Sequence, residues 1–204
     1  RNPSNYQGFF PDPGAPDPWV RQQSSMTLAD FSGYGYHTWQ MLPGLAVQGG
    51  LAYQYVELPR NHLYAPLVSV EESQDRLTPK GGLTWTPFQD TVVRAAYTSA
   101  LTGVSLEQSY RLEPVQVAGF TQGYRSVIPE AETGGPSPAA FVETWGVSIE
   151  QKLRTRTYLG VGGDLLSSDV ERFRGEFDLS NLAPDPAVRP ETLDYTEESL
   201  TATL

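Results

Sequence analysis

The chain has 204 residues, of which 14 are basic and 24 acidic, so its formal net charge is −10. Such an acidic chain is a poor partner for nucleic acid phosphates, and the lack of cysteine excludes disulfides, thiolate metal centres and cysteine nucleophiles. No apolar run approaches the ~18–20 residues of a membrane helix. A membrane β-barrel stays open, because its strands alternate and are mildly polar on average.

The first 25 residues are rich in proline and predict an irregular segment or an outer loop. Proline removes a backbone donor and fixes φ, which disfavours both a helix and a central strand. The prolines stand at positions 3, 11, 13, 16 and 18. We therefore divide the chain into a Pro-rich segment, 1–25, and a β-rich remainder, 26–204.

Beyond Met26 the dominant pattern is an alternation with period two. Leu45–Tyr55, Phe141–Leu153 and Thr157–Leu165 each place apolar side chains on one face and polar or very small ones on the other. Side chains of a strand point alternately to its two faces, so each segment predicts a strand with one apolar side. No amphipathic helix of ten or more residues competes with this pattern.

The connections between these segments alternate between tight turns and long excursions. Tight turns are predicted near Pro43, Phe88 and Thr155, and long connections at 59–78, 101–140 and about 180–192. The sequence thus predicts an all-β, antiparallel up-and-down meander of about seven strands. They are Thr27–Gln40, Leu45–Leu58, Pro79–Pro87, Thr91–Ala100, Phe141–Leu153, Thr157–Val170 and a strand that opens at Leu193 and stops midway. Gln116–Arg125 also alternates, and we place it inside the long connection 101–140 as a loop segment or an extension above a membrane.

Two architectures fit this meander. One is an outer-membrane β-barrel with short periplasmic turns and long outer loops. The other is a soluble extracellular or periplasmic β-sandwich that binds a glycan or a protein partner. The barrel should expose one set of side chains to lipid, whereas the sandwich should bury the same set against a second sheet. The set is Val47, Leu51, Trp145, Val147 and Leu159.

Two elements resemble a known family. The segment Arg76–Tyr97, with Gly81 and Gly82 at a bend or bulge, is similar to barrel hairpins of TonB-dependent outer-membrane receptors. The element Leu112–Pro114 followed by Val117–Phe120 resembles a motif that precedes a descending strand in that family. Its sequence is similar to that of receptor-like barrels that follow tetratricopeptide repeats in some bacterial proteins.

The resemblance implies a bacterial outer-membrane location and a non-enzymatic role in substrate uptake. The implied partners are the lipid bilayer, the remaining strands of a parent barrel and an unidentified small-molecule or glycan substrate. An energy-coupling protein is left open as a further partner, and nucleic acid is not expected. We expect the chain to be an internal segment of a larger barrel, truncated within its last strand.

We assign no catalytic, cofactor-binding or metal-ligating residue. Four charged side chains lie opposite the apolar stripes and are candidates for lining the lumen of a barrel, where ions stay hydrated. They are Arg94, Glu150, Lys152 and Asp164.

Overall fold

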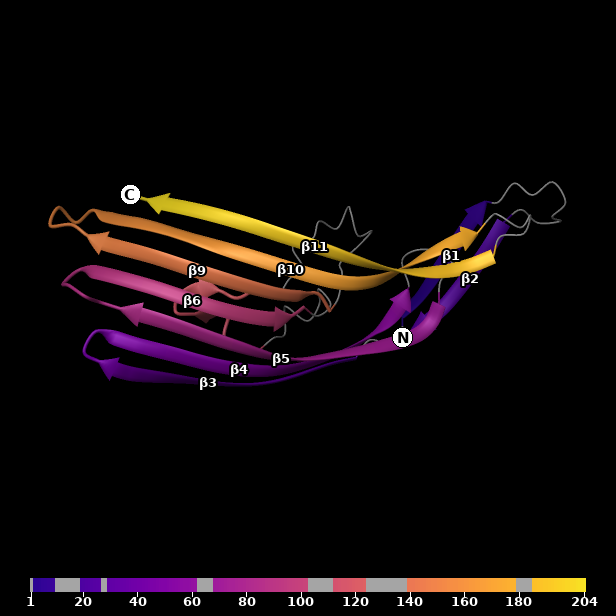
Figure 1. The fold of residues 1–204 in the computed structure, drawn as a ribbon, viewed down its shortest axis with the longest axis horizontal. Coiled ribbons are helices and arrows are strands. Elements are labelled where there is room, and N and C mark those ends of the chain that lie inside the picture. Colours follow the sequence, from indigo (N-terminus) through magenta and orange to yellow (C-terminus); the bar gives the residue numbers. More distant parts are fainter. Residues whose placement is uncertain are drawn as a thin grey trace. The chain divides into compact units, whose positions relative to one another are not determined.

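The computed structural model describes residues 2–9, 19–26, 29–61, 68–102, 112–123, 139–178 and 185–204, almost all of them in β-strands (Figure 1). Seven strands form one sheet in the order β11-β10-β9-β6-β5-β4-β3. They are β3 (Ala29–Leu42), β4 (Leu45–Asn61), β5 (Val68–Trp85), β6 (Thr91–Leu101), β9 (Phe141–Lys152), β10 (Tyr158–Asp178) and β11 (Asp185–Thr203). Within the described part, β3 and β11 each have a neighbour on one side only. The all-β meander is confirmed.

The chain forms two compact units. The first, here called the sheet unit, comprises residues 31–55, 75–170 and 194–204. The second comprises residues 1–30, 56–74 and 171–193. In the part of the chain that the structure describes, no helix is long and apolar enough to cross a membrane.

The second unit contains a pair of strands within the segment that the sequence predicts as irregular or as an outer loop. Strands β1 (Asn2–Phe9) and β2 (Trp19–Met26) pair antiparallel, with Asn2 opposite Met26 and Phe9 opposite Trp19. Of the five prolines in this region, only Pro3 falls in a strand. A two-stranded ladder tolerates proline, because alternate backbone N–H groups point away from the partner strand. The other four prolines lie outside the described residues, and the division at residue 25 stays a prediction.

The tight turns lie where the sequence predicts them. Gly44 adopts a left-handed φ of 79°, and its carbonyl accepts a 2.7 Å hydrogen bond from the backbone N–H of Thr86 in the neighbouring turn. Asp90 and Arg156, in the second and third turns, also have positive φ values of 65° and 63°. Left-handed residues of this kind let two antiparallel strands reverse within a few residues.

Two strands begin earlier than the sequence predicts. Strand β5 starts at Val68 rather than Pro79, and β11 starts at Asp185 rather than Leu193. Residues 71–76 of β5 are polar on both faces, so this part lacks the alternation by which strands are recognised. Strand β11 contains two prolines, but it lies at the edge of the sheet, where missing donors are tolerated.

The register gives the sheet unit two chemically different faces. Val147 lies opposite Ala95 and Gly163, whereas Gly146 lies opposite Ala96 and Asp164. Because side chains alternate, odd-numbered residues of β9 form an apolar face and even-numbered residues form a polar face. The apolar face is the exposed one: Leu51, Trp145, Val147 and Leu159 are 46%, 58%, 62% and 39% exposed, and Val47 is partly exposed. A two-layered sandwich would bury these side chains, so the exposure contradicts it.

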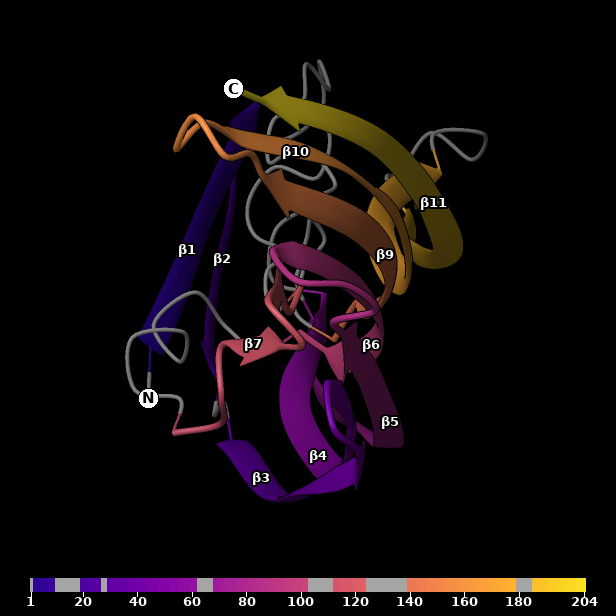
Figure 2. The same ribbon diagram turned by 90° about the vertical axis from the view of Figure 1, so that its left-hand side faces the viewer.

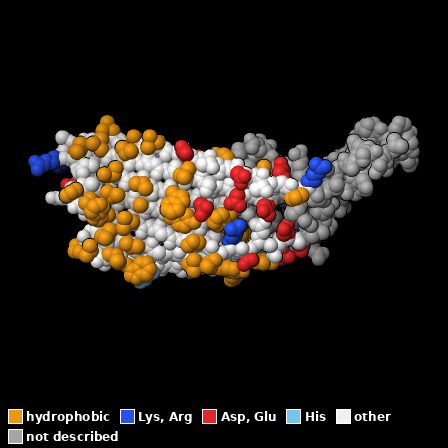
Figure 3. Space-filling view, in the orientation of Figure 1, with side chains coloured by type: hydrophobic (Ala, Val, Ile, Leu, Met, Phe, Trp, Pro, Cys, Tyr) orange, Lys and Arg blue, Asp and Glu red, His pale blue; other side chains and the backbone are white. Residues whose placement is uncertain are grey.

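Apolar side chains gather over one part of the sheet. Figure 3 shows them concentrated toward the end that carries the tight turns, with acidic side chains farther along the strands. On β9 the apolar face runs from Trp145 to Ile149 and is bounded by Glu143 and Gln151. Residues 143–151 make nine positions, and a membrane-crossing strand needs about 9–11.

Candidate functional site

The polar face of the sheet unit carries small and hydrogen-bonding side chains. They include Gln48, Gly50, Lys80, Gly82, Arg94, Gly146, Ser148 and Glu150. Lys80 and Gly146 are buried, and the side chain of Lys80 is 0% exposed. The others are half-buried except Glu150, which is exposed. In the structure, a segment from the long connection between β6 and β9 covers part of this face.

That segment, Leu112–Gly123, is here called the strap. It contains the short hairpin of β7 (Gln116–Val117) and β8 (Phe120–Thr121), which reverses through positive φ values of 47° at Ala118 and 92° at Gly119. Figure 2 shows the hairpin on the concave side of the curved sheet. Gln116–Arg125 was predicted as a loop segment or an extension above a membrane. The described part is a loop segment, but it is folded onto the polar face.

A buried ion pair anchors the first end of the strap. Lys80 of β5 pairs with Oε1 of Glu113, and both side chains are at most 1% exposed. The hydroxyl of Tyr36 donates a 2.5 Å hydrogen bond to the same carboxylate oxygen and accepts one of 3.0 Å from Nε2 of Gln122. The Tyr36 ring lies where Gly50 has no side chain, since a Cβ added there would collide with the ring. Hydrogen bonds with an ionised partner are roughly twice as strong as those between neutral groups.

Glycines on the polar face receive the apolar side chains of the strap hairpin. A Cβ added at Gly82 would lie 2.7 Å from Cβ of Ala118, and one added at Gly146 would collide with the Phe120 ring. Val117 of the hairpin also faces Gly82 and is 0% exposed. The strap therefore packs on the sheet at positions where glycines leave room for its side chains.

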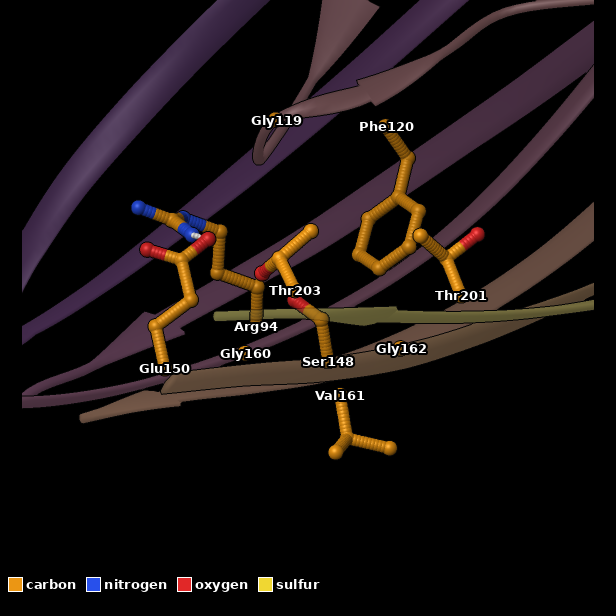
Figure 4. Close-up of a pocket in the computed structure, with 10 residues that line it drawn as sticks. All are labelled: Arg94, Gly119, Phe120, Ser148, Glu150, Gly160, Val161, Gly162, Thr201 and Thr203. Atoms are coloured by element: carbon orange, nitrogen blue, oxygen red, sulfur yellow. Dashed lines mark hydrogen bonds and ion pairs between the residues drawn. The ribbon is translucent and has the colours of Figure 1, made fainter. Parts of the chain in front are cut away.

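A small pocket lies at the tip of the strap, and we call it the tip pocket. Its volume is about 240 Å³, and its lining comes from Gly119 and Phe120 of the strap and from strands β6, β9, β10 and β11. Arg94 pairs with Glu150 at one side of the pocket, and the Phe120 ring points toward the sheet at the other (Figure 4). Ser148 and Thr203 lie between them, and Thr201 lies beyond the Phe120 ring (Figure 4).

The structure brings together two of the four predicted lumen-lining residues. Arg94 and Glu150 form an ion pair in the tip pocket. Lys152 lies outside the pocket lining, with its ammonium 5.8 Å from the centre of the Tyr158 ring. Asp164 accepts a 2.6 Å hydrogen bond from the hydroxyl of Ser199 and also lies outside the lining. Their role as lumen-lining residues stays a prediction.

Sequence reasoning missed the side chains that hold the strap. The partners Lys80 and Glu113 are 33 positions apart, and no local pattern marks them as a pair. The element Leu112–Pro114 and the segment Val117–Phe120 stand out in the sequence, but the region was placed in a loop segment or an extension above a membrane, and nothing in it indicates that it covers the polar face. Phe120 has no polar or periodic signature of its own.

The apolar face carries an aromatic cluster where it gives way to acidic side chains. The Tyr97 and Trp145 ring centres are 4.4 Å apart, and the Tyr97 hydroxyl donates a 2.6 Å hydrogen bond to Glu143. Aromatic side chains with one polar end favour the boundary between hydrocarbon and water.

Comparison with known proteins gives one finding. A family model described as TonB dependent receptor-like, beta-barrel matches residues 1–192. No curated protein and no solved structure matches the chain.

Proposed function

Because the matched region covers most of its length, the chain belongs to the family of TonB dependent receptor-like β-barrels, and we propose that it forms part of a barrel that takes up a solute across the bacterial outer membrane. The family indicates an outer-membrane transport or receptor role. Uptake of a specific substrate, a non-enzymatic mechanism and coupling to an energy-transducing partner are our proposals.

The observation that carries this proposal is the contrast between the two faces. The apolar face exposes Leu51, Trp145 and Val147. Exposure of such side chains is unfavourable in water, but it carries no free-energy penalty in hydrocarbon. The polar face has its hydrogen-bonding groups directed to the other side, where a barrel encloses water. The Tyr97–Trp145 pair then lies at the membrane boundary nearer the long connections.

The strap has a direct consequence for transport. It occupies part of the polar face of the sheet unit and is held there by Lys80, Tyr36 and Gly82. In a barrel, a segment in this position narrows the lumen and places its own side chains along the route of the solute. We propose that Arg94 and Glu150 contact the solute from the wall and Phe120 from the strap.

Two measurements test this function. Fractionation of cells should place the full-length protein in the outer membrane. A strain that lacks it should fail to deplete at least one solute that the parent strain removes from the medium, and collapse of the proton gradient in the parent should reproduce that failure. Recovery in a soluble fraction, or identical depletion profiles in the two strains, would contradict the proposal.

A further inference from the structure

We propose that the tip pocket binds one ring of a neutral sugar. This inference rests on the proposed function, since it names the class of solute that the wall and the strap recognise together. Three properties of the pocket carry it: its charge, its surface chemistry and its size.

The charge of the pocket favours a neutral ligand. Arg94 and Glu150 are the charged side chains among the described lining residues, and they pair with each other. The positive charge of Arg94 is already balanced by Glu150, so neither a carboxylate or phosphate ligand nor a cation would meet an uncompensated opposite charge in the pocket. The side chains are 27% and 52% exposed, so the pair is partly hydrated and contributes little to stability. Its outer N–H groups and carboxylate oxygens remain able to hydrogen-bond a ligand.

The surface chemistry of the pocket matches a sugar ring, which has hydroxyls around its edge and C–H groups on its faces. Ser148 and Thr203 supply hydroxyls that can both donate and accept hydrogen bonds. The Phe120 ring supplies an apolar surface. A ligand with hydroxyl groups alone would leave that surface in contact with polar atoms, and a purely apolar ligand would leave the hydroxyls without partners.

The sheet is shaped to keep this space open. Gly160 and Gly162 lie on the polar face, and Figure 4 shows the side chain of Val161 between them pointing away from the pocket. A Cβ added at Gly160 would lie 2.6 Å from the Thr203 hydroxyl oxygen. A side chain at this position would therefore crowd a lining hydroxyl.

The size of the pocket restricts the ligand to one ring. Its volume of about 240 Å³ is smaller than the ~300–1,000 Å³ of pockets that enclose drug-sized molecules. A single pyranose ring fits this space, and further rings of a longer glycan would extend past the exposed side of Glu150.

The test uses the full-length protein purified in detergent and saturation-transfer NMR. The probes are the methyl glycosides of glucose, galactose, mannose and xylose, with citrate as a charged comparison. We expect saturation transfer to at least one glycoside and none to citrate. Phe120→Ala should weaken glycoside binding about tenfold, as expected for loss of an aromatic contact at the centre of a site. Phe88→Ala, which removes an exposed phenylalanine outside the pocket, is the matched control and should bind as the wild type does.

A second variant separates binding from docking of the strap. Phe120 also packs on Gly146, so its loss affects the strap, whereas Thr203→Val removes one lining hydroxyl from β11 and leaves the strap contacts in place. It too should weaken binding. The inference is overturned if no glycoside binds, if both variants bind as the wild type does, or if citrate binds in preference. Failure here with the protein still in the outer membrane leaves the proposed function intact; recovery in the soluble fraction overturns both.

Discussion

Replacing Lys80 by methionine should release the strap from the polar face. In the wild type, Lys80 pairs with Glu113, and the two side chains are 0% and 1% exposed. The variant keeps most of the side-chain volume but removes the Lys80 ammonium from the buried Glu113 carboxylate. Tyr36 continues to donate a hydrogen bond to that carboxylate, but a hydroxyl does not neutralise the charge.

The magnitude follows from burial. Removing one partner of a fully buried ion pair costs about 3–5 kcal/mol, because the remaining charge is uncompensated. When the strap undocks, Glu113 reaches water and this cost disappears, so the whole penalty acts on the docking equilibrium. A change of about 3 kcal/mol raises the undocked population at least about a hundredfold.

The chain contains no cysteine, which allows a clean assay. Val117, on the side of the strap that faces Gly82 of the sheet, is 0% exposed, so a Val117→Cys reporter reacts with a polar maleimide only when the strap opens. Labelling of this reporter in the full-length protein should be slow in the otherwise wild-type chain. Lys80→Met should accelerate it at least about a hundredfold, or to the rate of a fully exposed cysteine.

The double variant Lys80→Met with Glu113→Gln is the control for this reasoning. It has no buried charge and keeps an acceptor for Tyr36, so its labelling rate should return to within about tenfold of the reporter alone, a residual cost of about 1 kcal/mol. Equal labelling of the single variant and the reporter would refute the account of the ion pair. So would a double variant as reactive as the single one.

Two further predictions concern neighbouring or opposed positions. Gly82→Ala should accelerate labelling at Val117→Cys, because its Cβ would approach Ala118 at 2.7 Å and overpacking costs about 1–3 kcal/mol. Gly81→Ala is the control and should not accelerate labelling, because a Cβ there meets nothing within 4 Å. Equal labelling rates in the two variants would argue against close packing of the strap on Gly82. Val161→Arg on the apolar face should lower the free energy of unfolding by about 2–4 kcal/mol, measured by denaturant unfolding from vesicles. Thr201→Arg on the polar face should lower it far less. The reverse order would mean that the faces are assigned wrongly.

Much of the sheet could be predicted because the alternation of apolar and polar residues reflects the different surroundings of its two faces. Phe141–Leu153 was predicted as a strand and is observed as Phe141–Lys152, since its two faces meet different surroundings and the sequence alternates accordingly. Where both faces meet water, the alternation disappears. That is why the first residues of β5, with Glu71, Glu72 and Asp75, were predicted as a loop.

The site was less predictable because it depends on contacts between distant positions. Arg94 and Glu150 could be proposed singly as polar-face residues, but their pairing depends on the register between β6 and β9. Gly82 fits a bend or bulge when considered alone, and its role as a seat for Ala118 requires the strap to be in place. A single sequence carries no signal that joins these positions.

Two spin labels can distinguish an apolar face in contact with hydrocarbon from a polar face that lines an aqueous lumen. Single cysteines are placed at Val147 and at Ser148 of the full-length protein, spin-labelled and reconstituted in vesicles. Electron paramagnetic resonance then measures the accessibility of each label to oxygen and to a nickel chelate. We expect the label at 147 to be accessible to oxygen and protected from the chelate, and the label at 148 to show the opposite preference. Equal preferences at the two positions, or a label at 147 shielded from both reagents, would contradict it.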